Sequence, residues 1–324
     1  MRIVAAVGGN ALLERGERPD AEIQQRHIRI AIDALAPLAR SDQLVVTHGN
    51  GPQVGLLARE SAADLALARP YPLDVLGAQT QGMIGYWLLQ GFQNAVPGRE
   101  IASVITQTLV SATDPAFADP AKFVGPVYPE AEARRIAAKR GWTVKADGDL
   151  WRRVVASPIP LRVVETRLIR QLLNADVVVI CAGGGGAPVV RNRLGELEGI
   201  EAVVDKDATA GLLAEALDAD LLVVLTDVAG VKTGYGTPAA RPIHRATPAD
   251  LRALRSRPDQ WALKSKPSAG SSSSPTVPPP SVPCATSTAS SPAKPAPSLH
   301  PPAPTYLPTR DPEGRRPRSR QPCP

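Results

Sequence analysis

The sequence predicts an α/β fold in which an open, mainly parallel sheet is sandwiched between helices. Short apolar runs rich in Val and Ile, at 3–7, 44–47 and 177–182, alternate with longer amphipathic stretches, and each run ends in a glycine turn. Strand, helix, strand at this spacing implies parallel strands joined by right-handed crossovers. Ligands of such sheets bind at the carboxyl ends of the strands, so the glycine turns are candidate binding loops.

The N-terminal part of the chain alternates regularly. After the strand at 3–7, Asp20 is the candidate N-cap of a helix that ends near Arg40. The next expected elements are a strand at 44–47, helices at 53–68 and 73–94, and a strand at 101–109.

From Thr113 to Trp151 the pattern loosens, and this range is expected to leave the sheet as a lid or small subdomain. Alternation then resumes up to a short helix expected to begin at Thr247. The elements expected between are strands at 152–157, 177–182 and 221–226 and helices at 163–173 and 208–217.

The composition changes sharply at Pro258. Residues 258–324 hold 18 of the 34 prolines and contribute +5 of the formal net charge of +6. This segment cannot bury enough apolar surface to offset its ordering entropy, so we predict a folded domain at 1–257 and a disordered Pro/Ser-rich tail at 258–324. Because the basic charge belongs to the tail, it does not indicate a nucleic-acid or membrane partner for the folded part.

Cysteine usage indicates a reducing compartment. Cys181 falls in a core strand and Cys284 and Cys323 in the tail, which is neither a disulfide framework nor a metal-ligand spacing. The first apolar run is too short for a signal peptide, and no stretch is long enough to span a bilayer. The sequence therefore predicts a cytoplasmic protein.

The three glycine turns point to phosphoryl transfer, which needs backbone N–H groups and cations around the developing charge. They are Gly8-Gly9-Asn10, Gly49-Asn50-Gly51 and Gly183 to Gly186. Without Cβ atoms, their N–H groups can approach an anionic ligand. None matches the P-loop or the dinucleotide-binding pattern, so both of those standard nucleotide sites are disfavoured.

Charged residues follow the predicted strands at the same edge. Lys206 lies between Asp205 and Asp207 just before a helix, and this triplet is either part of a site or a solvated helix start. Asp227 follows the strand at 221–226 and is either a ligand or a turn residue. His48, beside Gly49, is a ligand or base, or it makes a structural hydrogen bond.

Taken together, these features resemble the carbamate kinases, a branch of the amino-acid kinase superfamily. The resemblance runs from Ile3 to about Arg252. It is carried by residues 7–12, 47–55, 71–78, 125–128, 152–155, 183–190, 201–207 and 225–228. The glycine turns are shared across the superfamily, whereas 71–78 and the insertion at 122–128 are specific to this branch.

The resemblance implies an amino-acid kinase fold with a small protruding subdomain at about 113–151. It implies reversible phosphoryl transfer from carbamoyl phosphate to ADP, giving ATP and carbamate, in arginine and carbamoyl-phosphate catabolism. ATP or ADP and Mg²⁺ are then the expected cofactors, and the expected assembly is a homodimer without nucleic-acid or membrane partners.

The resemblance also implies a role for each candidate residue. Substrate oxygens would be held by Gly8, Gly9, Asn10, Gly49, Asn50 and Gly51. Lys122 would reach the substrate phosphate from the subdomain, Lys206 would neutralise the transferring phosphoryl group, and Asp207 would help to orient Lys206 and Mg²⁺. The nucleotide would be bound by Gly184, Gly185, Asp227 and Tyr235. No residue is expected to be a resident metal ligand.

The end of the chain departs from the family. The family is expected to continue into a Gly-Ser-Met-Gly-Pro-Lys segment, whose lysine contacts the nucleotide phosphates, and then into a helix and closing strands. Codons that encode residues 258–267 can be read in another frame as Gly-Ser-Met-Gly-Pro-Lys-Val-Glu-Ala. We therefore predict that a frameshift just before Pro258 replaced the last part of the domain.

Two alternatives stay open on the sequence. The first is another small-molecule kinase of the same superfamily, and the second is an inactive, truncated pseudokinase. Lys122 with residues 125–128 argues against the first, because other branches lack that subdomain. The reason for the second alternative is the loss of the lysine in the family's Gly-Ser-Met-Gly-Pro-Lys segment, which would be the third lysine of the site after Lys122 and Lys206.

Overall fold

The computed structural model describes residues 1–9, 12–13 and 17–225. Beyond them it describes the backbone of four short strands, β13 (Lys232–Thr233), β14 (Arg241–Pro242), β15 (Trp261–Ala262) and β16 (Cys284–Ser287). The chain divides into two units, Met1–Ala289 and Ser290–Pro324. The second unit, the expected helix at Thr247 and most of the predicted tail lie outside the described residues.

The main sheet is parallel, as the sequence predicts. Its strand order is β16-β12-β1-β2-β9-β3, and each of its pairs is parallel. Besides β16, its strands are β1 (Arg2–Val7), β2 (Gln43–His48), β3 (Ile101–Ser103), β9 (Val178–Ile180) and β12 (Leu221–Leu225). Because β1, β2 and β9 are neighbours, the loops that follow them meet at one edge.

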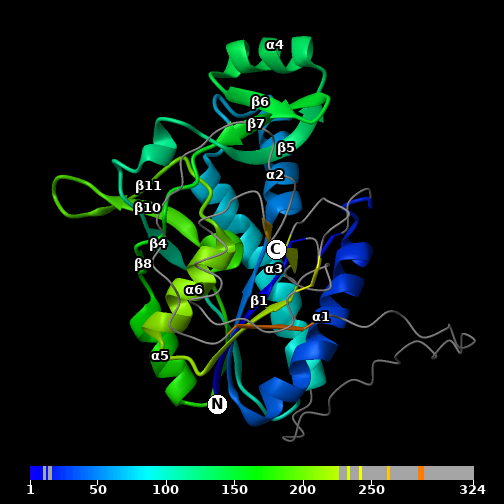
Figure 1. Cartoon of the computed structure of the whole chain (residues 1–324), viewed down its shortest axis with the longest axis vertical. Helices are drawn as coiled ribbons and strands as arrows, with labels where there is room; N and C mark the ends of the chain where they lie inside the picture. Colours follow the sequence, from blue (N-terminus) through cyan, green and yellow to red (C-terminus); the bar gives the residue numbers. More distant parts are fainter. Residues whose placement is uncertain are drawn as a thin grey trace, which may run out of the picture. The chain divides into compact units, whose positions relative to one another are not determined.

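Helices cover both faces of this sheet (Figure 1). Ile3, Ala5 and Val7 of β1 contribute to a core with α1 (Ala21–Ser41) and α3 (Leu73–Ala95). The alternate residues Val4 and Ala6 contribute to a second core with α5 (Thr166–Asn174) and α6 (Lys206–Ala216). The strand is therefore buried on both faces, which is why its sequence is continuously apolar.

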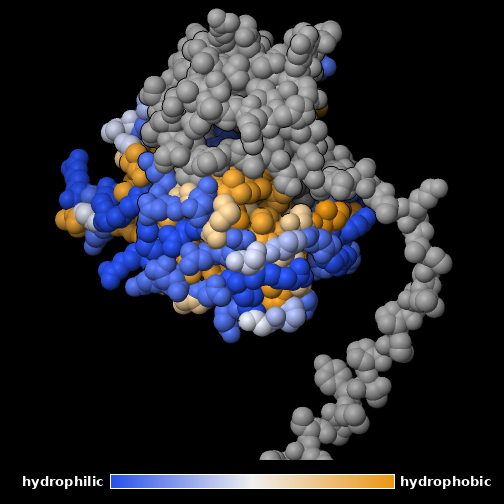
Figure 2. All heavy atoms as spheres, turned by 60° about the horizontal axis from the view of Figure 1, so that its bottom comes forward, coloured by the Kyte–Doolittle hydropathy of each residue, from blue (hydrophilic) through white to orange (hydrophobic). Residues whose placement is uncertain are grey.

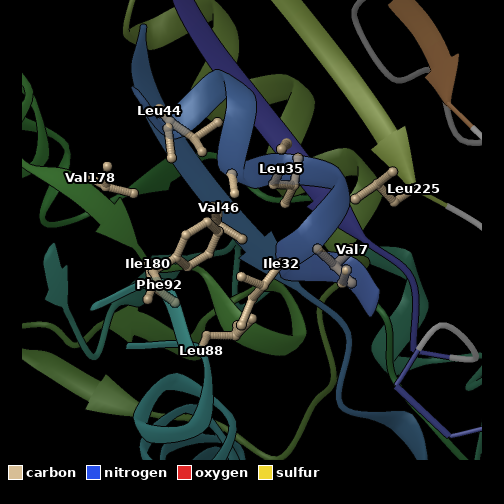
Figure 3. Close-up of a cluster of buried hydrophobic side chains, with 14 of the residues drawn as sticks. Val7, Ile32, Leu35, Leu44, Val46, Leu88, Phe92, Val178, Ile180 and Leu225 are labelled. Atoms are coloured by element: carbon tan, nitrogen blue, oxygen red, sulfur yellow. The ribbon is translucent and has the colours of Figure 1, made fainter. Parts of the chain in front are cut away.

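Figure 3 shows the first of these cores, where Phe92 and Leu88 of α3 lie near Ile32 of α1, and Leu35 of α1 belongs to the same cluster. Asp20 occupies the N-cap position of α1, as predicted, although its side chain makes no capping hydrogen bond. The helix α2 (Gly51–Ala63) ends before the predicted Ala68.

The single strand expected at 101–109 is wrong, because β3 and β4 (Gln107–Leu109) belong to different sheets. The backbone N–H of Thr106 donates to Gln81 Oε1 at 3.0 Å, and Gln81 Nε2 donates to the Thr106 carbonyl at 3.1 Å. These side-chain bonds from α3 hold the backbone of Thr106 between the two strands. The second sheet has the order β11-β10-β4-β8, with β8 (Arg162–Val163), β10 (Ala187–Arg191) and β11 (Leu197–Gly199).

A protruding subdomain follows η1 and extends to Val155 (Figure 1, top), so it runs past Trp151, where the predicted excursion ends, and includes most of the strand expected at 152–157. Its antiparallel sheet has the order β5-β7-β6, with one helix packed on it. The elements are β5 (Lys122–Tyr128), α4 (Glu130–Arg140), β6 (Thr143–Asp147) and β7 (Leu150–Val155), preceded by the 3₁₀ turn η1 (Pro115–Phe117). Lys122 thus begins the subdomain's first strand.

The amino-terminal edge of the main sheet is polar. An open cavity of about 380 Å³ lies there, lined by Met1, Arg2, Ser41, Asp42, Gln43, Asp176, Asp218 and Asp220. Figure 2, which turns the lower end of Figure 1 forward, shows polar side chains over most of the described surface, with apolar groups between them. Among the described residues, no helix is long and apolar enough to cross a membrane.

His48, the last residue of β2, is 1% exposed. Its Nδ1 lies 3.0 Å from the carbonyl oxygen of Gly49, which can only accept, so Nδ1 carries the proton. Burial lowers the pKa of His48 to about 4. The hydrogen bond to Gly49 opposes this shift, and the positive charge of Lys206 adds to it. The ring is therefore neutral at pH 7.

We predict that mild acid destabilises the fold through His48. Between the ordinary pKa of 6.5 and about 4, the unfolded chain binds a proton that the folded chain does not. The contribution of His48 to the free energy of unfolding is complete above pH 6.5 and is lost as the pH falls to about 4. Its maximum is roughly 3 kcal/mol. Urea unfolding between pH 4 and 7 measures this, and His48→Gln should remove that part of the pH slope. Equal slopes in both proteins would contradict the prediction.

Truncation of Phe92, which is fully buried between α1, α3 and the sheet, should lower the free energy of unfolding. We expect Phe92→Ala to lose about 3–5 kcal/mol, because it removes apolar contacts and leaves a cavity. The neighbouring Gln93 is exposed, so Gln93→Ala should stay within about 0.5 kcal/mol. Denaturant unfolding of the two variants checks this, and a Phe92→Ala loss below about 1 kcal/mol would show a loosely packed core.

Candidate active site

The glycine turns after β1 and β2 meet closely. The N–H of Gly49 donates to the Val7 carbonyl at 2.9 Å, which extends the ladder between the strands. A Cβ added to Gly49 would lie 2.5 Å from the nitrogen of Gly9 and 3.3 Å from Cδ of Lys206. Real Cβ atoms do not approach backbone this closely, so the position requires glycine. The same contact places the stem of Lys206 beside this turn.

The third turn follows β9 as a short 3₁₀ helix, η2 (Gly183–Gly185). Gly184 has a φ of 63°, and an added Cβ there would collide with the carboxamide of Asn50. Asn50 is itself held by a 2.8 Å hydrogen bond from its Nδ2 to Thr80 Oγ1. Thr108 and Thr209 donate to the Gly185 carbonyl at 2.7 and 3.1 Å. Buried side chains therefore fix the loop from several elements.

His48 has a structural role at this edge. Its ring lies where a Cβ on Gly183 would be, and its Nδ1 is engaged by the Gly49 carbonyl. Of the two interpretations that the sequence leaves open, the structure favours the structural hydrogen bond. A buried neutral imidazole that fills the space under a glycine turn helps to shape that turn.

The N-terminus of α6 carries the charge triplet. Asp205 is its N-cap and accepts hydrogen bonds from the N–H groups of Asp207 and Ala208, at 3.0 and 3.1 Å. Lys206 is only 9% exposed, and its ammonium group donates to the Asp207 carboxylate. The triplet is therefore not a solvated helix start, because its lysine is buried against the glycine turns.

Lys122 reaches this triplet from the subdomain. Its Nζ lies 3.0 Å from Oδ2 of Asp205, 83 residues away in the sequence. Burial alone would raise the pKa of Asp205, but the charge and hydrogen bond of Lys122, the N–H of Ala208 and the charge of Lys206 lower that pKa to about 2. Asp205 is thus ionised at neutral pH and holds Lys122 at the start of α6.

Most of the predicted site residues are brought together. Gly8, Gly9, Gly49, Asn50, Gly51, Gly184, Gly185, Lys206 and Asp207 lie in or beside three touching loops, and Lys122 joins them through Asp205. Asn10, Asp227 and Tyr235 lie outside the described residues.

Sequence reasoning gave no role to several residues that shape this site, namely Asp205, Thr80, Gln81, Thr108 and Thr209. Asp205 could have been identified from the sequence, because an aspartate before a helix that begins with Lys-Asp is a strong N-cap candidate. The Thr and Gln residues had none, because they act through contacts between distant elements.

The arrangement is suited to a phosphate group. Backbone N–H groups at glycine turns, a helix N-terminus and two lysines supply positive charge at one edge of the sheet. Among the described residues there is no group of three or more His, Cys, Asp or Glu side chains that could hold a metal ion.

Comparison with known proteins agrees with this chemistry. The sequence model of the Amino acid kinase family matches residues 1–270. A carbamate kinase from Rhizobium meliloti is 52% identical over 254 residues, which are 78% of each chain. A carbamate kinase from Escherichia coli K12 is 50% identical over 249 residues, 77% of this chain and 82% of the relative.

A solved structure gives the same result. The carbamate kinase from Giardia lamblia bound to AMP-PNP has a TM-score of 0.72 and 36% identity, and the match covers 80% of this chain and 84% of that one. Nucleotide use is thus a property of a relative with this fold. The sheet, the subdomain and the sequence together show that this chain belongs to the amino acid kinase family and, within it, to the carbamate kinases.

Proposed function

We propose that this chain transfers a phosphoryl group between carbamoyl phosphate and ADP, giving carbamate and ATP. The observation that carries the proposal is that Lys206 lies beside the Gly49 turn while Lys122 is bound to Asp205, the residue before Lys206. The two lysines come from different parts of the fold, and the acids of one triplet hold both. Two cations fixed at a cradle of N–H groups are what a phosphoryl group in transfer requires.

The glycine turns would bind the substrate. Gly8, Gly9 and Asn10, with Gly49, Asn50 and Gly51, are proposed to hold the carbamoyl and phosphate oxygens. Gly9 and Gly49 approach each other so closely that a Cβ would fill the space between the loops. At Gly51, by contrast, an added Cβ would meet nothing within 4 Å, which leaves backbone that an anionic group can approach.

The nucleotide would lie on the side of η2, with Gly184 and Gly185 near its phosphates. Asp227 and Tyr235 are proposed to line this side and stay predictions. Mg²⁺, bound with the nucleotide, would neutralise phosphate charge. Asp207, which accepts a hydrogen bond from Lys206, would orient that lysine and the metal-bound phosphates.

The phosphoryl-transfer step needs no proton transfer to or from the protein. An oxygen of the ADP β-phosphate attacks phosphorus, the bond to the carbamoyl oxygen breaks, and carbamate leaves as an anion. Nucleophile and leaving group are both anionic oxygens, so no general base is needed. This fits a site with two lysines and a His48 that is neutral and buried. Lys122 and Lys206 would stabilise the charge that spreads over the phosphoryl oxygens.

Several expectations from the sequence remain proposals. They are the Mg²⁺ requirement, the homodimer, the cytoplasmic location and the place in arginine and carbamoyl-phosphate catabolism. The frameshift before Pro258 also remains a proposal, which resequencing of that junction would test. An unshifted frame there would contradict it.

Restoring the predicted frame should raise activity. The restored chain would regain the family's third lysine, which contacts the nucleotide phosphates. A lost contact of this kind often costs about 10²–10³-fold in rate. ATP formation from ADP, Mg²⁺ and carbamoyl phosphate, followed by a coupled luminescence assay, compares the two purified chains. Equal activity would show that the third lysine is dispensable, and activity in neither would contradict the proposed substrate.

Removal of the Lys206 ammonium group should abolish most transfer in the more active of the two chains. We expect Lys206→Met to lower kcat by about 10²–10³-fold, because the stem is kept and the charge facing the phosphoryl group is lost. Lys139 is exposed on α4, so Lys139→Met is the matched control and should leave kcat unchanged. A Lys206→Met enzyme with more than half the original kcat would contradict the assigned role.

A further inference from the structure

The segment from Glu201 to Asp205 borders the subdomain along its length. The Arg153 guanidinium donates to Glu201 Oε1 at 2.7 Å. The N–H of Val203 then donates to the Ala156 carbonyl at 3.0 Å, just after β7. At the far end Asp205 pairs with Lys122 of β5. One short stretch of the main domain therefore meets the subdomain at three successive points.

Glu201 also makes a second contact, with the first residue of α3. Its Oε2 accepts the N–H of Leu73 at 2.8 Å. Leu73 is the first residue of α3, whose N-cap position is Pro72, a residue with no side-chain cap. The carboxylate of Glu201 thus caps α3 with one oxygen and holds the subdomain with the other.

The contact at Arg153 is relayed to Lys122 through the sheet of the subdomain. In the antiparallel register, Val155 of β7 pairs with Lys122 of β5. Arg153 lies two residues before Val155 on the same strand, and its side chain is only 15% exposed and stacks on Trp142 at 4.5 Å. A shift of Arg153 relative to Glu201 would therefore move Lys122 relative to Asp205.

The contact at Leu73 is relayed to the glycine turns. Thr80 and Gln81 lie on α3, where Thr80 accepts from Asn50 and Gln81 holds the backbone of Thr106. Both contacts support loops of the candidate site. Glu201 therefore touches the elements that place the subdomain lysine and the elements that place the substrate loops.

We propose that Glu201 is a positioning residue for phosphoryl transfer, which sets the place of Lys122 over the site by holding Arg153 of the subdomain and the N-terminus of α3 at once. The inference rests on the proposed function for its catalytic consequence. Its structural content, the coupling of Glu201 to Lys122, does not depend on the reaction.

The first test measures the chemical reactivity of Lys122 in the full chain. Acetic anhydride acylates amines, and the ion pair with Asp205 shields the Lys122 amine from it. We expect Glu201→Gln and Arg153→Met each to raise the acetylation rate of Lys122 by about fivefold, measured by peptide mass spectrometry. The double variant should raise it no further, because both changes break one contact.

Matched controls separate positioning from general destabilisation. Glu198 is exposed in the preceding strand β11, and Glu198→Gln should leave the rate at Lys122 unchanged. Lys206 is buried in the main domain, so its own rate should not rise in Glu201→Gln. An unchanged Lys122 rate, or an equal rise at Lys122 and Lys206, would overturn the proposal.

The second test is kinetic. We expect Glu201→Gln to lower kcat about tenfold through a misplaced lysine, with the KM for ADP unchanged. A change in the KM for ADP alone would overturn the positioning role. If the unaltered chain forms no ATP, the proposed function fails for this chain, while the acetylation rates still decide whether Glu201 places Lys122.

Discussion

The close approach of Gly49 to Gly9 is the contact on which the rest of the site depends. A Cβ on Gly49 would lie 2.5 Å from the Gly9 nitrogen, so any side chain there would push apart the loops that follow β1 and β2. The stem of Lys206 lies on the same atoms, at 3.3 Å from that Cβ. Separation of the loops would therefore also disturb the contact between the Gly49 turn and the stem of Lys206.

The site also depends on a positive charge from outside the main sheet. Lys122 belongs to the subdomain and is held at 3.0 Å by Asp205, the N-cap of α6. Both lysines are thus bound by acids of one triplet, and neither is a lone buried charge, which would cost several kcal/mol. A phosphate that enters between them would exchange with these carboxylates.

The sequence predicts the parallel sheet and the edge at which its glycine turns meet, because both follow from local patterns. The apolar residues 3–7 must be buried on both faces, and glycines after β1, β2 and β9 mark the strand ends. The break between β3 and β4 has no local signal, since it depends on Gln81 meeting Thr106 25 residues away. The part played by Asp205 likewise depends on Lys122, 83 residues distant, although its capping position is readable from the sequence.

A crystal structure of the chain with Mg²⁺, ADP and carbamoyl phosphate tests the central claim most directly. The transferring phosphoryl group should lie within hydrogen-bonding distance of Nζ of both Lys122 and Lys206. The N–H group of Gly9 should point at its oxygens, and the adenosine should lie on the side of η2. A phosphoryl group bound away from the two lysines, or a nucleotide bound away from η2, would contradict the assignment of this edge as the active site.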